Sequence, residues 1–79
     1  MTLDALNQNS WAKISAINLS WEVRKHLMEM GILPGAKIKL IGQNPFGKVF
    51  LIQVEDTHVA ISQKIARAIG VEYTKKEQR

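Results

Sequence analysis

The sequence predicts a mainly β fold, a small barrel of about five strands with one inserted α-helix and a short helical turn. Three observations lead to this prediction: short β-branched segments recur between turn residues, a single segment has helical spacing, and the chain has only 79 residues. A barrel suits such a short chain, because curling a sheet on itself removes exposed edges where a second layer could not be built.

The first strand is predicted over residues 11–17, where apolar and polar residues loosely alternate. A helix of about three turns is predicted over residues 21–30. Asn18 and Ser20 are its candidate N-caps, because their side-chain oxygens can accept hydrogen bonds from free helical N–H groups. Gly31 is expected to end the helix in a left-handed conformation. The i, i+4, i+7 spacing predicts an apolar face formed by Val23, Leu27 and Met30.

The rest of the chain has the pattern of strands joined by turns. A loop over residues 42–47 and a tight turn at Glu55-Asp56 separate strands, and Ser62 can cap a helical turn over residues 66–68. The predicted strands cover residues 37–41, 48–54, 57–61 and 69–73. The predicted core consists of Ile38, Leu40, Val54, Val59, Ile61 and Val71, with Val23 and Leu27 of the helix covering it.

The chain is expected to form a single domain over residues 1–73, followed by a frayed tail over residues 74–79, which contain no apolar residue. It has no Cys, which excludes disulfides and thiolate zinc sites. Its start has no signal-peptide pattern, and its longest apolar run, residues 49–52, is far shorter than the ~20 residues of a transmembrane helix. We therefore expect a cytoplasmic protein without direct membrane insertion.

The formal net charge is +4, but the basic residues are spread along the chain. Nucleic-acid-binding domains usually gather such residues on one face or along one stripe. The aromatic residues also do not cluster on one strand pair, as a platform for base stacking would require; they are Trp11, Trp21, Phe46, Phe50 and Tyr73. The sequence therefore predicts no nucleic-acid partner.

Patterns for catalysis and metal binding are missing from the sequence. The two histidines, His26 and His58, are in neither an H-x-x-x-H nor an H-E-x-x-H arrangement. His26 with Glu22 or Glu29 supplies two or three ligands from one helix, but we interpret these as exposed helix residues in water. Neither a Ser-His-acid arrangement nor a phosphate-binding glycine loop is present. We therefore predict no enzymatic activity, no cofactor and no metal site.

The predicted helix carries large apolar residues on its outer face. Trp21 and Met28 lie roughly opposite the apolar core face, beside Arg24 and Lys25. Trp, Met and Arg are enriched in the centres of protein interfaces. We therefore predict that Trp21, Arg24 and Met28 contact a partner protein.

Two further points concern this predicted contact. Pro45 and Phe46, in the loop after the next strand, are candidates for the same surface, because exposed aromatic residues commonly mark contact sites. Two alternatives stay open: a loop or the N-terminal residues 3–6 cover the outer face of the helix within the molecule, or that face serves self-association of the chain into a homo-oligomer.

Several segments resemble the FeoA family, the small accessory component of bacterial ferrous iron uptake. Residues 2–6 read Thr-Leu-Asp-Ala-Leu. Residues 24–35 read Arg-Lys-His-Leu-Met-Glu-Met-Gly-Ile-Leu-Pro-Gly, which fits the family pattern of a basic residue, apolar residues, an apolar-Gly pair and Pro-Gly without a gap. Residues 45–47, Pro-Phe-Gly, and residues 59–61, before the short helical turn, also fit. The resemblance extends from residue 2 to residue 71.

The resemblance implies an SH3-like barrel, with residues 1–73 as a single FeoA domain in the cytoplasm that has no enzymatic activity. The implied partner is FeoB, the membrane permease with a cytoplasmic G-protein domain that carries Fe(II). The chain is thus expected to be an accessory or regulatory protein that binds the cytoplasmic part of FeoB. Scaffolding, gating and tuning of nucleotide turnover all stay open as its mode of action.

A second class of function is retained as the alternative. The same small barrel is similar to the C-terminal domain of metal-dependent repressors and to nucleic-acid-binding barrels, so the alternative is a regulatory or nucleic-acid-binding module in transcription. The sequence has no helix-turn-helix that such a domain would regulate. A nucleic-acid shift assay over a salt series separates the two classes.

Overall fold

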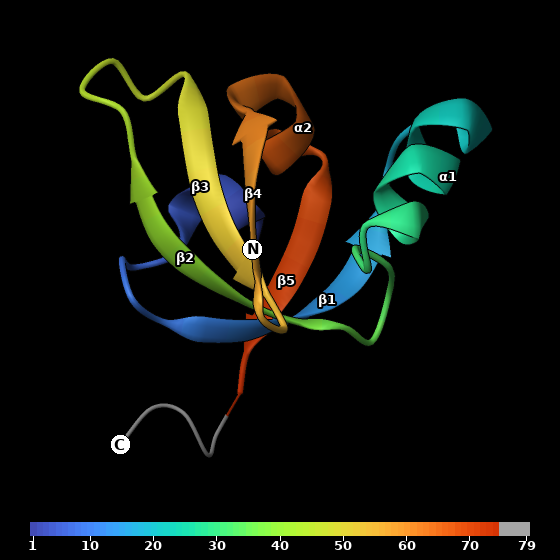
Figure 1. Ribbon diagram of the computed structural model, residues 1–79, viewed down its shortest axis with the longest axis horizontal. Coiled ribbons are helices and arrows are strands. Elements are labelled where there is room, and N and C mark those ends of the chain that lie inside the picture. Colours follow the sequence, from blue (N-terminus) through green and yellow to red (C-terminus); the bar gives the residue numbers. More distant parts are fainter. Residues whose placement is uncertain (75–79) are drawn as a thin grey trace.

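The structure is a computed structural model that describes residues 1–74 of the chain. It is mainly β, as predicted, and every predicted strand and helix is present (Figure 1). The predicted tail over residues 74–79 lies outside the described residues apart from Thr74. In chain order the elements are a short 3-10 helix η1 (Leu3–Ala5), β1 (Trp11–Ile17), α1 (Trp21–Glu29), β2 (Lys37–Gln43), β3 (Val49–Val54), β4 (Thr57–Ser62), α2 (Gln63–Arg67) and β5 (Ile69–Tyr73).

Both α-helices begin at a serine whose hydroxyl satisfies a free backbone N–H. In α1, Ser20 Oγ accepts a hydrogen bond from the Val23 N–H at 3.4 Å, so Ser20 rather than Asn18 is the N-cap. In α2, Ser62 Oγ accepts a hydrogen bond from the Ile65 N–H at 3.2 Å. The caps predicted at the two serines are confirmed, and α2 starts earlier than predicted because it follows its cap directly.

The end of α1 is a Schellman motif around Gly31, which has a φ of +86°. The Gly31 N–H donates to the Met28 carbonyl at 2.9 Å, and the Ile32 N–H donates to the Leu27 carbonyl at 2.9 Å. The predicted left-handed end is confirmed, and both Leu27 and Ile32 enter the core. The prediction that Met30 lies on the apolar face is wrong: Met30 is the C-cap, where the helical path ends, and it is 43% exposed.

The five strands form one antiparallel sheet in the order β4-β3-β2-β1-β5. The sheet curls around its core (Figure 1), and register shifts in β1 and β2 accompany the bends. The predicted barrel-like, five-stranded fold is confirmed, but the sheet does not close. β4 and β5 are its edges. The gap between them is occupied by η1 and α2, with η1 against α2 and β5, and α2 against both β4 and β5. The expectation that closure removes all edges is therefore wrong.

The core fills the inside of the curled sheet and is apolar among the described residues. The predicted core residues that are buried are Leu27, Ile38, Leu40, Val54, Ile61 and Val71. Val23 and Val59 are partly buried against this core. The buried residues that the prediction did not include are Leu3, Leu6, Ala12, Ile14, Ile32, Phe50, Ile52, Ala66 and Ile69.

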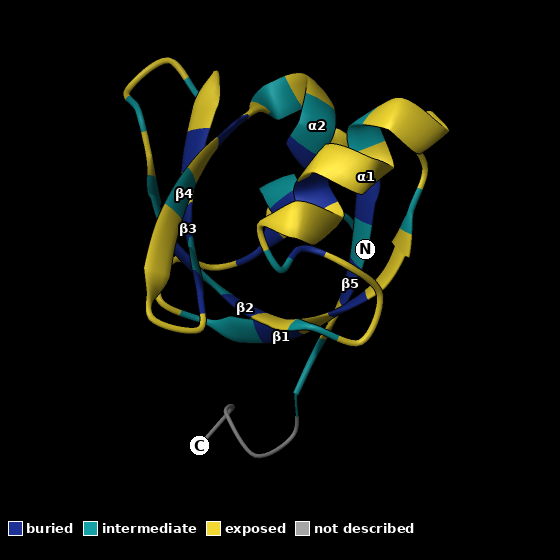
Figure 2. Cartoon of the chain, turned by 45° about the vertical axis from the view of Figure 1, so that its right-hand side comes forward, coloured by how far each residue is buried: buried dark blue, intermediate teal, exposed yellow. Residues whose placement is uncertain are grey.

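Helix α1 stands at the side of the curled sheet and is attached by one face (Figures 1 and 2). Within α1, Leu27 is buried and Val23 is partly buried, while the other residues are exposed. Most of the helix therefore faces solvent, as the exposed colour along α1 in Figure 2 shows. No helix within residues 1–74 is long and apolar enough to cross a membrane.

Candidate functional site

The outward face of α1 exposes a group of large side chains. Trp21 is 60% exposed and Met28 is 43% exposed. Arg24 Cζ lies 5.8 Å from the centre of the Trp21 ring, which is a cation–π contact. The three residues are spaced at i, i+3 and i+7, so they lie along one side of the helix, and all three are exposed whereas Leu27 is buried. We refer to Trp21, Arg24 and Met28 as the α1 surface.

The N-terminal segment does not cover the α1 surface. Leu3 is fully buried and Leu6 is 6% exposed, and both belong to the core inside the sheet. The segment forms η1, which packs on α2 and β5. The alternative that residues 3–6 cover Trp21 and Met28 is therefore wrong.

Charged side chains surround the α1 surface. A shallow hollow of about 470 Å³ lies beside Trp21 and is lined by Trp21, Glu22, Lys25, His26 and Glu29. His26 Nδ1 lies 3.5 Å from Glu29 Oε1. An apolar centre with a charged rim is the common anatomy of a protein interface.

The other tryptophan, Trp11, has different surroundings. It lies on β1 and is partly buried. Its register partner on β2 is Lys39, whose Nζ lies 5.9 Å from the centre of the Trp11 ring. Trp11 is thus packed against a neighbouring strand, whereas the cation beside Trp21 belongs to its own helix.

Pro45 and Phe46 lie in the loop between β2 and β3, and Phe46 is 81% exposed. Asn44 shapes this loop, because its Oδ1 accepts hydrogen bonds from the Lys48 N–H at 2.8 Å and the Val49 N–H at 3.2 Å. Figures 1 and 2 both show this loop across the molecule from α1. The structure therefore does not bring Pro45 and Phe46 together with the α1 surface.

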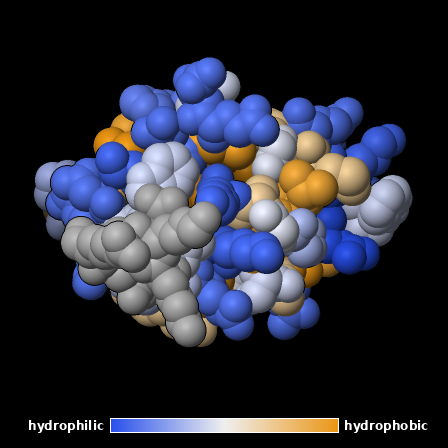
Figure 3. All heavy atoms as spheres, turned by 90° about the horizontal axis from the view of Figure 1, so that it is seen from below, coloured by the Kyte–Doolittle hydropathy of each residue, from blue (hydrophilic) through white to orange (hydrophobic). Residues whose placement is uncertain are grey.

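The face of the molecule seen in Figure 3 is mostly hydrophilic, and its hydrophobic side chains lie in small groups. Scattered apolar side chains of this kind are normal on protein surfaces and need no partner. The α1 surface differs from this background because a Trp, an Arg and a Met lie together on a single helix face.

Metal-ligating residues do not gather in the described part of the chain. Within residues 1–74, no three His, Cys, Asp or Glu side chains lie together as a metal site would require. The side chain of His26 is 79% exposed and pairs with Glu29, and His58 is exposed on β4. The most developed chemical feature of the described surface is therefore the group of large apolar and cationic side chains on α1.

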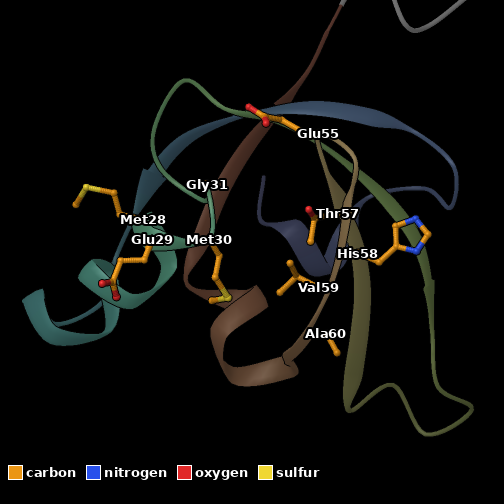
Figure 4. A pocket seen from close by; sticks show the side chains of 9 residues that line it. All are labelled: Met28, Glu29, Met30, Gly31, Glu55, Thr57, His58, Val59 and Ala60. Atoms are coloured by element: carbon orange, nitrogen blue, oxygen red, sulfur yellow. The ribbon is translucent and has the colours of Figure 1, made fainter.

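A groove that the sequence did not predict lies between the end of α1 and β4 (Figure 4). Its volume is about 780 Å³. Met30 and Val59 point into the groove, whereas the side chain of His58 points away from it. Sequence reasoning missed this groove because the strand order decides which strand lies beside α1. The residues that line it are Met28, Glu29, Met30, Gly31, Glu55, Thr57, His58, Val59 and Ala60.

Comparison with known proteins identifies relatives of this chain. The FeoA domain family matches residues 1–73. The solution structure of the FeoA protein from Chlorobium tepidum is similar with a TM-score of 0.87 and 25% identity, over 92% of this chain and 70% of that chain. Iron(II) transport protein A from Clostridium thermocellum has a TM-score of 0.86 and 26% identity, over 92% of this chain and 45% of that chain. No curated protein matches this chain in sequence.

The same fold also occurs within repressors. The structure of ScaR with bound Zn²⁺ has a TM-score of 0.82 and 20% identity, over 94% of this chain and 37% of the repressor. The manganese regulator SloR has a TM-score of 0.78 and 14% identity, over 92% of this chain and 34% of the regulator. At these identities the likeness shows the fold alone.

The family match and the structural likeness agree with each other. A crystal structure described as iron uptake regulatory protein (FeoA) has a TM-score of 0.79 and 25% identity, over 92% of this chain and 94% of that chain. FeoA domains are accessory or regulatory domains of ferrous iron transport and are not a known enzyme family. With the family match extending over residues 1–73, this chain belongs to the FeoA family.

Proposed function

We propose that this chain is a non-enzymatic accessory protein that acts in the cytoplasm by binding the cytoplasmic part of a FeoB-type ferrous iron permease. Membership in the FeoA family supports the link to ferrous iron transport. The proposed contact is the α1 surface, formed by Trp21, Arg24 and Met28. The observation that carries this choice is the exposed Trp21 ring with the Arg24 guanidinium beside it.

These residue types suit the centre of an interface. Trp and Arg are the residues whose truncation most often costs an interface much of its binding energy. Covering Trp21 removes a large apolar ring from water. It also excludes water from the contact between that ring and Arg24, and a cation–π interaction is stronger when it is desolvated. Arg24 can in addition pair with an acidic group on the partner.

The helix presents these side chains in a fixed arrangement. Leu27 anchors α1 in the core, and the caps at Ser20 and Gly31 fix both ends of the helix. The surface residues follow an i, i+3, i+7 spacing, which is how a helix fills a groove on its partner. We therefore expect an apolar groove with an acidic rim on the permease, and little rearrangement of this chain on binding.

Pro45 and Phe46 are proposed as a second contact, separate from the α1 surface. Phe46 is 81% exposed, so a partner that covers it would remove a large aromatic ring from water. A standard interface covers about 800 Å² of each partner, and the loop lies across the molecule from α1 (Figure 1). We therefore assign the loop to a different contact, either with another part of the permease or with a second copy of the chain.

The test is binding of the purified cytoplasmic part of the permease, measured by calorimetry. The double variant Trp21→Ala, Met28→Ala is expected to stay folded and to lose at least about tenfold in affinity, which corresponds to about 1.4 kcal/mol. Val49→Ala is the matched control, because Val49 is as exposed as Met28 at 43% and lies on β3. The variant Phe46→Ala asks separately whether the loop takes part.

The possible outcomes test two claims separately: which surface makes the contact, and which protein is the partner. Binding by the double variant at wild-type affinity would show that the α1 surface is not the contact. Failure of the wild-type chain to bind would reject the permease as partner, and a concentration-dependent dimer lost in the double variant would point to self-association instead. Circular dichroism of each variant checks that the fold is intact.

A further inference from the structure

The two edges of the sheet differ in what covers them. At the β5 edge, the Val71 N–H donates to the Met1 carbonyl at 2.9 Å, and Thr2 forms a β-bridge with Gly70. The N-terminal segment therefore pairs with this edge. At the β4 edge, no residue within the described part of the chain pairs with the outer side of the strand.

The register of β3 and β4 identifies the free backbone groups. The Gln63 N–H donates to the Lys48 carbonyl at 2.9 Å, so Gln63 faces β3. Hydrogen-bonded and non-hydrogen-bonded residues alternate along an antiparallel pair. By this alternation Val59 and Ile61 also face β3, whereas His58 and Ala60 direct their N–H and C=O groups toward the open edge.

Strand β4 also lacks three of the features that keep edge strands from pairing. Native proteins block edge strands with Lys, Pro or a β-bulge. β4 reads Thr-His-Val-Ala-Ile-Ser and has none of the three: it contains neither Lys nor Pro, and its register against β3 runs without a shift. The edge of β4 is therefore free to accept another strand.

The groove beside β4 has room for one extended chain. It lies between the edge of β4 and the end of α1, with a volume of about 780 Å³ (Figure 4). That volume is in the range of pockets that hold a small ligand or a few residues. A second copy of the whole domain, pairing edge to edge, would bring its own sheet against α1. The position of α1 thus favours a single peptide strand over a second barrel.

The lining of the groove indicates the chemistry of that strand. The charged side chains are Glu29 and Glu55, and none of the residues that line the groove is Lys or Arg. This local excess of acid contrasts with the net charge of +4 for the whole chain. Met30 and Val59 supply apolar surface inside the groove (Figure 4). Apolar side chains and one basic side chain therefore complement it.

We propose that β4 binds an extended segment of a partner protein as an additional strand of the sheet. The backbone groups of His58 and Ala60 hydrogen-bond to this segment, its apolar side chains contact Met30 and Val59, and a Lys or Arg of the segment lies near Glu29 or Glu55. Strand addition of this kind is a known mode of peptide recognition, in which backbone hydrogen bonds give affinity and alternate side chains give specificity. This site adjoins the α1 surface, because Met28 also lines the groove, but its backbone pairing through His58 and Ala60 does not depend on the proposed permease contact.

The test uses short synthetic peptides with blocked ends, in which Val and Thr alternate and a single Lys is moved through the positions. Binding is followed by NMR chemical shifts and by amide hydrogen exchange. With a peptide at ten times its dissociation constant, exchange of the His58 and Ala60 amides is expected to slow about tenfold, because only the free fraction exchanges. Peptides with Gln in place of Lys should bind more weakly, and the variant Glu29→Gln, Glu55→Gln should remove that difference.

Two matched controls test the backbone pairing itself. A peptide that is N-methylated at the residues facing β4 should lose binding, whereas the same peptide N-methylated at the alternate residues should keep it. Ala60→Pro should also abolish binding, while Ala60→Ser, which retains the N–H, should not. Pro is tolerated on an edge strand where its N–H would face solvent, and the N-methylated peptides decide the matter if this variant does not fold.

Each remaining outcome would overturn the proposal. The absence of saturable binding by every peptide at millimolar concentration would do so. So would binding that leaves the His58 and Ala60 amides unchanged, or equal binding by both N-methylated peptides. If exchange of these amides slows with increasing protein concentration in the absence of peptide, the edge pairs with a second copy of the chain instead.

Discussion

The inner face of α1 packs against the core, whereas its outer face is exposed to solvent. On the inner face, Leu27 is 2% exposed and is the single fully enclosed residue of the helix. On the outer face, Trp21 and Met28 stand in solvent with Arg24 between them in sequence. The same nine residues thus hold the helix to the sheet with one face and present large side chains with the other. The contrast teaches that stability and binding can be altered separately within this helix.

The largest expected effect comes from removing the inner anchor. Leu27→Ala leaves a cavity where α1 meets the core, and it should lower the free energy of unfolding by about 2–5 kcal/mol. That is a large part of the stability of a small domain. Chemical denaturation measures the loss. Met28→Ala, one residue further along the chain, is the control and should change stability little, so equal losses would contradict the assignment of the two faces.

A smaller effect is expected at the turn that brings the inner face into the core. Gly31→Ala forces a side chain into a φ of +86°, which should cost about 1–2 kcal/mol in unfolding free energy. The added Cβ would also lie 3.2 Å from Val54 Cγ1, so some core movement is needed. Gly35→Ala is the matched control, because Gly35 has a φ of +95° with nothing within 4 Å of the added Cβ. Equal losses for both variants would show that the contact with Val54 costs nothing.

The smallest expected effect on stability lies on the outer face. The double variant Trp21→Ala, Met28→Ala should change the free energy of unfolding by less than about 0.5 kcal/mol, as surface substitutions usually do. Thermal melts followed by circular dichroism give this value beside the binding data. A loss as large as that of Leu27→Ala would mean that Trp21 and Met28 help to hold α1 in place, and the separation of the two faces would fail.

Local patterns in the sequence were sufficient to predict most of the fold. Strand alternation, the serine caps and Gly31 act over a few residues, so the sequence around them contains the needed information. The exposure of Trp21 and Met28 also followed from helical spacing alone. Met30 was misplaced because the helical spacing was continued into the C-cap, where the chain leaves the helix.

Features that depend on how distant segments meet could not be predicted in this way. The open edge of β4 and its groove arise because η1 and α2 occupy the gap between the edge strands. The sequence of β4 alone does not indicate that its edge is open or that a groove lies beside it. The separation of Phe46 from Trp21 likewise depends on how the β2–β3 hairpin projects from the curled sheet (Figure 1). For the candidate site, the sequence therefore predicted the chemistry of single residues but not which of them lie together.

The placement of the two tryptophans allows the sheet and the helix to be followed separately by intrinsic fluorescence. Trp11 is partly buried on the sheet under Lys39, while Trp21 is 60% exposed on the helix. An exposed indole emits at longer wavelength and is quenched by iodide more readily than one that is partly enclosed. Replacing Trp21 by Phe leaves Trp11 as an indicator of sheet unfolding, and replacing Trp11 by Phe leaves Trp21 as an indicator of whatever contacts the helix. Unfolding and partner binding can then be observed in one molecule without an attached dye.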